Sequence, residues 1–181
     1  MAFNVAEFRS QMTGDGARPN LFSVSLTFPS FINGGVDASR KATFMAKAAQ
    51  LPGSTVGQVS LSYFGRELKF VGNRSFPDWT VTIINDENFV VRNTMEKWLN
   101  SLNSHSGNVR DINAAQPSNY SVDAEVTQYG KTGNELKKYK FVGMFPLDLA
   151  PIALDWGSND TIEEFDITFA YQYWTTTDST T

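Results

Sequence analysis

The chain has 181 residues, a formal net charge of −4 and a pI of about 5.0. This length fits a single domain spanning residues 1–181, and 14 Phe, 6 Tyr and 4 Trp supply the apolar area for one hydrophobic core. The lack of cysteine excludes disulfides, a thiolate nucleophile and a Cys-ligated zinc site, while the acidic balance argues against a protein that grips nucleic acid.

The N-terminal stretch lacks the basic and apolar regions of a signal peptide. No stretch reaches the roughly 18 to 20 apolar residues that a membrane span requires. We therefore expect a chain that stays soluble in the cytoplasm where it is made and does not insert into a membrane.

The first predicted strand covers residues 21–28. Its side chains alternate, so that one face carries Phe22, Val24, Leu26 and Phe28. Residues 29–40 contain a proline and an Asn-Gly-Gly run, which predict an exposed loop. A short strand is expected over residues 41–48.

Residues 57–72 predict a β-hairpin, because two alternating runs flank the turn candidate Phe64-Gly65. One face of this hairpin carries Val59, Leu61, Tyr63, Leu68 and Phe70. The opposite face carries Ser60, Ser62, Glu67 and Lys69.

A helix over residues 87–102 is predicted after a strand at residues 79–84. Its apolar residues recur at helical spacing: Val91, Met95, Trp98, Leu99 and Leu102. Asn85 or Asp86 is expected to cap the first turn. Residues 104–118 are rich in Ser, Asn, Gly and Ala and predict a loop.

Residues 120–129 and 135–145 predict a second hairpin, and a last strand is expected over residues 161–174. The tail at residues 175–181 has no large apolar residue, which predicts flexibility. The total is seven or eight strands with one flanking helix, which indicates a mainly β sandwich or barrel.

No residue pattern marks catalytic chemistry, and we expect no enzyme activity, no metal site and no cofactor. The single histidine, His105, lies in a polar loop and is expected to be solvated. Glu163 and Glu164 are neighbours on a strand and should point to opposite faces. The segment at residues 155–160 lacks the spacing and final Glu of a calcium loop, which favours a turn held by Asx hydrogen bonds.

Lys137, Lys138 and Lys140 form the main basic cluster. On a strand, such lysines are expected to be solvated or to pair with acids across the ladder. A contact with phosphate is the weaker alternative. Several strands also have clean polar faces, a pattern compatible with an isolated sandwich and with a subunit of a tube.

Several segments in one order along the chain resemble the tail tube protein family of T-even-like contractile-tailed phages. They cover most of residues 17–174: Ala17-Arg18-Pro19-Asn20-Leu21-Phe22, Gly72-Asn73-Arg74-Ser75-Phe76, Asp78-Trp79-Thr80-Val81-Thr82, Ile84-Asn85-Asp86-Glu87, Leu154-Asp155-Trp156-Gly157-Ser158-Asn159 and Tyr173-Trp174. Residues 29–40 and the tail after Trp174 look like departures from the family pattern.

The resemblance implies a sandwich or barrel core, hexameric rings stacked into a tube, and a lumen lined by a barrel shared among subunits. It implies a virion tail component synthesised in the host cytoplasm. It also implies contacts with tail sheath, baseplate and tail terminator proteins, and transient passage of double-stranded DNA without specific binding.

Contacts between one ring and the next are expected from residues 1–16 and from the hairpin at residues 57–72. The inter-subunit candidates lie on one face of this hairpin: Val59, Leu61, Tyr63, Leu68 and Phe70. Lumen-lining candidates come from the polar strand faces: Ser60, Ser62, Asp123, Glu125, Thr168 and Gln172. An acidic or near-neutral lining lets DNA pass, because bound Lys and Arg would retain it through counterion release.

Two alternatives stay open at this point. The first is the tube protein of a related injection machine, such as a type VI secretion system or a phage-tail-like bacteriocin. The second is a carbohydrate-binding β-sandwich whose exposed aromatic side chains stack on sugars.

Overall fold

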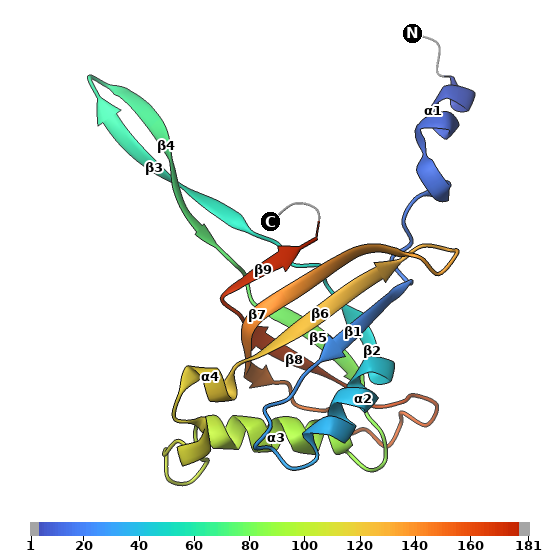
Figure 1. The fold of residues 1–181 in the computed structure, drawn as a ribbon, viewed down its shortest axis with the longest axis vertical. Coiled ribbons are helices and arrows are strands. Elements are labelled where there is room, and N and C mark those ends of the chain that lie inside the picture. The colour runs from blue at the N-terminus through green and yellow to red at the C-terminus, as the bar shows by residue number, and fades with distance from the viewer. Residues whose placement is uncertain (1–3, 178–181) are drawn as a thin grey trace.

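The computed structural model describes residues 4–177, in which a strand-rich body carries helices at one end and two projecting elements at the other (Figure 1). The strands are β1 (Phe22–Leu26), β2 (Ala46–Ala49), β3 (Thr55–Tyr63), β4 (Arg66–Ser75), β5 (Trp79–Ile84), β6 (Val122–Tyr129), β7 (Glu135–Leu149), β8 (Glu164–Ala170) and β9 (Tyr173–Thr176). The helices are α1 (Val5–Gln11), α2 (Gly35–Met45), α3 (Val90–Leu102) and α4 (Pro117–Tyr120), with 3-10 turns at Thr13–Asp15 and Ile112–Ala114.

Seven of the described strands form one antiparallel sheet in the order β1-β6-β7-β8-β5-β2, and β9 pairs with β7. The long strand β7 belongs to both halves of this sheet. Its first part pairs with β6 and β9, and its last part pairs with β8. The change comes next to Gly143, whose φ is 65°, a conformation that favours glycine.

The two halves of the sheet face each other across the core. The Trp79 ring of β5 stacks on the Phe141 ring of β7 with the centroids 4.2 Å apart. The strand residues that enclose this space are buried: Val24, Leu26, Trp79, Val81, Ile83, Ala124, Val126, Phe141, Phe165, Ile167 and Phe169. The arrangement confirms the predicted mainly β sandwich or barrel.

Helix α3 closes one end of the core. Val91, Met95 and Trp98 are buried along one face, as the helical spacing predicts. The Trp98 indole N–H donates to the carbonyl oxygen of Tyr120 at 3.1 Å. The helix begins at Val90, three residues later than expected, so Phe89 stands at the N-cap position in place of the predicted Asn85 or Asp86. Asp86 still contacts the first turn, because its Oδ1 accepts from the Val90 amide at 3.2 Å.

Helix α2 corrects the sequence analysis. The exposed loop expected at residues 29–40 and the strand expected from residue 41 are wrong, because residues 35–45 are helical and the strand covers only Ala46–Ala49. The buried residues of α2 are Gly35, Ala38 and Ala42. Their small side chains give a weak hydrophobic pattern, yet they allow close packing: a Cβ on Gly35 would lie 3.1 Å from the Cβ of Phe28.

The last predicted strand is broken in two. Residues 164–170 form β8 and pair with β5, whereas residues 173–176 form β9 and pair with β7. The expected flexible tail starts at Thr175, but Thr175 and Thr176 are strand residues. Residues 178–181 of that tail lie outside the described part of the chain.

The predicted first hairpin is confirmed as β3–β4, which stands clear of the body (Figure 1). Phe64 and Gly65 have φ values of 46° and 77°, as a two-residue hairpin turn with both central residues at positive φ requires. Helix α1 also projects from the body. Within residues 4–177, no helix is long and apolar enough to cross a membrane.

Candidate assembly surfaces

One half of the sheet presents a polar outer face built by β1, β6, β7 and β9. The strand register places Ser25 beside Glu125, Glu125 beside Lys140, and Lys140 beside Thr175. One row of polar side chains therefore crosses all four strands. The side chains that alternate with this row point into the core, as the full burial of Val24, Leu26, Ala124 and Phe141 shows.

Two ion pairs lie on this face. Lys138 Nζ is 2.8 Å from Glu125 Oε2, and Lys140 Nζ is 2.8 Å from Asp123 Oδ2. The contacts confirm that these lysines pair with acids across the ladder, while Lys137 instead lies over the ring of Tyr139, 5.7 Å from its centroid. Opposite charges cancel locally, so this face is close to neutral.

The ion pairs shift the pKa values of Lys138, Lys140 and Asp123. The hydrogen bond to Glu125 raises the pKa of Lys138, and the hydrogen bond to Asp123 raises the pKa of Lys140. Burial acts to raise the pKa of Asp123, but the hydrogen bonds from Lys140 and the Gly143 amide outweigh it and hold that pKa below its usual 3.8. Asp123 and Lys140 therefore both keep their charges across the neutral pH range.

The same half of the sheet ends in two strands that each have one partner within the described chain. β1 pairs with β6, and β9 pairs with β7. Each strand therefore has a second edge with no paired strand among the described residues, although the Leu26 carbonyl of β1 accepts from the Ser39 hydroxyl. Free edges of this kind are a template for pairing between copies.

The other half of the sheet has a separate polar face on β5 and β8. Thr80 Oγ1 lies 3.2 Å from Thr168 Oγ1, and Thr82 donates to Asp166 Oδ1 at 2.6 Å. Because both sheet halves turn their apolar side chains towards one core, the polar faces of β6 and β8 look away from each other. The six lumen candidates are thus dispersed over several surfaces: Asp123 and Glu125 on β6, Thr168 on β8, Gln172 at the bend before β9, and Ser60 and Ser62 on the hairpin.

The hairpin β3–β4 has an uncovered apolar face. The register pairs Val59 with Phe70 and Leu61 with Leu68, next to Tyr63, and all five predicted contact residues are between 44% and 64% exposed. Helix α1 is similarly uncovered, with Val5, Phe8 and Met12 at helical spacing and exposed. Monomeric proteins rarely expose contiguous apolar surface of this kind without a partner.

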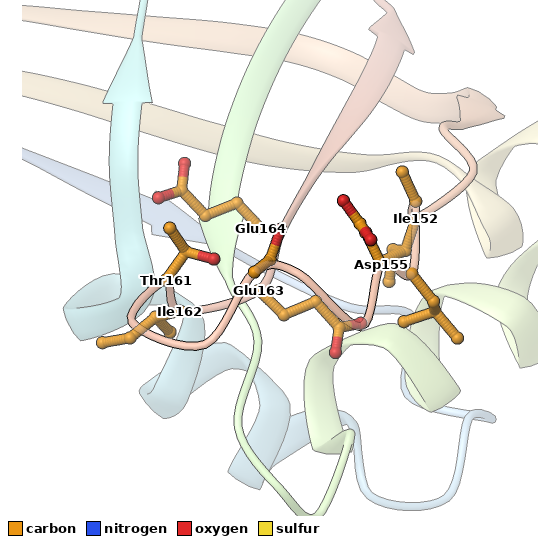
Figure 2. Close-up of a pocket in the computed structure, with 9 residues that line it drawn as sticks. Ile152, Asp155, Thr161, Ile162, Glu163 and Glu164 are labelled. Carbon is orange, nitrogen blue, oxygen red and sulfur yellow. The ribbon is translucent and has the colours of Figure 1, made fainter.

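An open hollow of ≈ 360 Å³ lies against the segment at residues 152–164 (Figure 2). The carboxylates of Glu163 and Glu164 point apart there, as predicted, although β8 begins only at Glu164 (Figure 2). Glu163 accepts from the Asn85 side-chain amide at 3.1 Å, and Glu164 pairs with Lys47. Asp155 Oδ1 accepts from the Gly157 amide at 2.9 Å, which confirms the predicted Asx turn. These three carboxylates therefore hold neighbouring segments of the chain in place through hydrogen bonds and an ion pair.

His105 lies exposed in its loop, where the sequence analysis placed it. Its Nδ1 is 2.9 Å from Asn100 Oδ1, and its backbone amide donates to the same oxygen at 3.2 Å. The contacts tie the loop to the end of α3. Among the described residues, no group of three or more His, Cys, Asp or Glu side chains is placed to hold a metal ion.

The sequence of the chain is similar to those of phage tail tube proteins. A family model described as "Phage tail tube protein" matches residues 17–177, a range that includes residues 29–40. The chain is 33% identical over 167 residues to the tail tube protein gp19 of Enterobacteria phage T4, covering 92% of this chain and 95% of the relative. It is 29% identical over 169 residues to the tail tube protein of Serratia phage KSP90, covering 92% and 93%.

The fold is also similar to solved structures of low sequence identity. A chain of the anti-feeding prophage baseplate matches with a TM-score of 0.65 at 12% identity, over 89% of this chain and 95% of that one. A chain of the sheath-tube complex of an extracellular contractile injection system, PVC, matches with a TM-score of 0.59 at 14% identity, over 97% and 98%.

A strand-rich subunit with free sheet edges and projecting apolar elements belongs to the structural proteins that assemble through many copies. The chain is a member of the phage tail tube protein family. It is therefore a structural component of the virion tail and not an enzyme, and this membership sets aside the carbohydrate-binding alternative.

Proposed function

We propose that the chain builds the inner tube of a contractile phage tail, as hexameric rings whose subunits join edge to edge. In this proposal β9 of one copy pairs with β1 of the next. The two strands are the first and last of four antiparallel strands, so they run in opposite directions and their joint continues the antiparallel order. Such a head-to-tail contact closes into a ring when the rotation between copies divides a full turn.

The outer face of β1, β6, β7 and β9 then lines the lumen. The observation that carries this assignment is the polar row from Ser25 to Thr175, which would continue from copy to copy around the ring. Asp123 and Glu125 are the lumen residues of the proposal. Thr168 lies on the face that looks away, where a sheath would surround the tube.

A near-neutral lining suits the passage of double-stranded DNA. Phosphates bind where Lys and Arg replace their counterions, and affinity rises steeply with the number of such contacts. Lys138 and Lys140 are already paired with acids, so they offer little net charge to a passing phosphate. The duplex would pass without specific binding.

The partners proposed for the tube are tail sheath, baseplate and tail terminator proteins. The similar folds come from structures described as a sheath-tube complex, a baseplate and a sheath/tube terminator. Two of those structures are described as parts of an extracellular contractile injection system, which keeps the tube of a related injection machine as a second candidate. The sequence relatives at 29% and 33% identity are phage proteins and favour the phage tail.

Electron microscopy of the purified protein tests the proposal. Negative-stain images over a range of concentrations are expected to show rings with six-fold symmetry that stack into tubes. A protein that stays monomeric at every concentration and salt, even with a baseplate present as a nucleus, would contradict it.

A further inference from the structure

Two projecting elements of the chain have no apolar partner within the described residues. Val5, Phe8 and Met12 form a stripe along α1, and Val59, Leu61 and Tyr63 run along one face of the hairpin. The elements leave the body on the side away from α3 and diverge (Figure 1), so they cannot cover each other in one copy. Because all copies are identical, every copy supplies one stripe and one face.

The position of each element relative to the proposed ring joint brings them together between neighbours. The base of the hairpin is tied to β9, because the Trp174 indole N–H donates to the carbonyl oxygen of Gly53 at 3.0 Å. Helix α1 precedes β1 in the chain, with residues 12–21 and a 3-10 turn between them, and it projects from the side of the body on which β1 begins (Figure 1). Pairing β9 of one copy with β1 of the next therefore places the hairpin of the first copy beside α1 of the second.

The dimensions of the two surfaces agree. The apolar stripe runs from Val5 on α1 to Met12, the residue that ends the helix, and is about 10 Å long at a rise of about 1.5 Å per residue. The hairpin face from Val59 to Tyr63 is about 13 Å long at about 3.3 Å per residue. The helix also carries its own N-cap within the single chain, because Asn4 Oδ1 accepts from the amides of Ala6 and Glu7 at 3.1 and 3.4 Å.

We propose that the apolar face of hairpin β3–β4 receives helix α1 of the neighbouring subunit in the same ring. This inference rests on the proposed tube function and adds a second contact to each joint. It assigns Phe8, at the centre of the α1 stripe, as the anchor. Docking removes Phe8 and the hairpin side chains from water, which favours the assembled ring over free subunits.

The natural absence of cysteine permits a direct test by cross-linking. The double variant Phe8→Cys with Leu61→Cys, assembled and treated with a short bismaleimide, is expected to give a ladder of covalent oligomers up to the ring. The matched control pairs Phe8→Cys with Ser62→Cys, which lies on the opposite face of the hairpin, and is expected to give a much weaker ladder. Equal ladders from the two variants would overturn the proposal.

A third variant separates failure of this inference from failure of the tube function. Ser25→Cys with Thr175→Cys reports the proposed joint between β1 and β9. Tubes that cross-link through Ser25 and Thr175 but not through Phe8 and Leu61 would overturn the docking of α1 and leave the tube standing. Absence of rings and tubes in unmodified protein would overturn both.

Assembly of a charged variant gives an independent readout. Phe8→Asp is expected to raise the concentration needed for half-assembly about ten- to a hundredfold, the range expected from losing one buried Phe side chain. Ser10→Asp adds the same charge to the other side of α1 and is expected to change it less than about threefold. Circular dichroism of the free subunits should be unchanged in both. Equal effects of the two substitutions would contradict the assignment of the stripe.

Discussion

Trp98 shows how much of the fold depends on single side chains. It is fully buried on α3, and its ring lies 5.7 Å from that of Phe28 and 6.4 Å from that of Phe169 between ring centroids. Trp98 thereby joins the helix to the segment after β1 and to β8 at once.

Trp98→Ala is expected to lower the free energy of unfolding by about 3–5 kcal/mol, because it leaves a cavity and an unpaired carbonyl at Tyr120. Urea unfolding of the subunit measures the loss. Lys97→Ala, at the exposed neighbouring position, should change stability by less than about 0.5 kcal/mol. A change of that small size in Trp98→Ala would contradict the packing described for α3.

Asp86 gives stability a dependence on pH. The hydrogen bond from Lys41 is the main cause that lowers the pKa of Asp86, and burial opposes it less strongly. A lowered pKa in the folded chain stabilises the fold above the unfolded value near 3.8, and this contribution is lost as pH falls through the folded value. Asp86→Asn is expected to cost about 1–2 kcal/mol at pH 7 and to differ less from the wild type near pH 2, as measured by urea unfolding at both pH values. An equal difference in stability between the wild type and Asp86→Asn at the two pH values would contradict the stabilising role assigned to the Asp86 charge.

At the scale of elements, the strands were the most predictable part. The alternation in residues 21–28 and 79–84 gives strands with the predicted faces buried, and the same is true of Ile167 and Phe169 on β8. These elements carry large apolar side chains at a period of two, so the sequence pattern and the burial have one cause. The hairpin β3–β4 follows the same period of two although its faces are exposed, and the apolar stripe of α3 follows the helical period and is buried.

The missed elements lack such side chains. Helix α2 buries Gly35, Ala38 and Ala42, which produce almost no apolar period, and its position depends on packing against β1. The second half of β9 falls in the predicted tail because Thr175 and Thr176 are polar, although β-branched residues favour strands. The free edge of β9, and with it the proposed joint, is visible only once the sheet is assembled.

The bend of β7 predicts an unequal effect of two glycine substitutions. A Cβ on Gly143 would lie 3.0 Å from Gln172 Cγ, whereas a Cβ on Gly133 meets nothing within 4 Å, and both residues have positive φ. Gly143→Ala is expected to cost about 2–3 kcal/mol and Gly133→Ala about 1 kcal/mol, since only the first adds crowding to backbone strain. Thermal unfolding compares them, and equal losses would show that the bend tolerates a side chain.

At the scale of the whole molecule, the proposed lumen predicts how the tube treats DNA. Removing both acids, as Asp123→Asn with Glu125→Gln, leaves Lys138 and Lys140 unpaired on the lining. Tubes of this variant are expected to retain duplex DNA. A plot of the logarithm of the binding constant against the logarithm of the salt concentration should have a slope of about −0.9 for each phosphate that the lysines neutralise. Asp166→Asn, on the other polar face, should leave DNA binding weak. Equal binding by both variants in a salt titration would contradict the lining.

The central claim is that β1, β6, β7 and β9 join edge to edge into a ring with their polar face inward. A cryo-electron microscopy map of assembled tubes tests it most directly. The account predicts six subunits per ring, β9 hydrogen-bonded to β1 of the neighbour, and Asp123, Glu125, Lys138 and Lys140 facing the lumen. A ring joined through other strands, or a lumen lined by the β5 and β8 face with Thr168 inward, would contradict it.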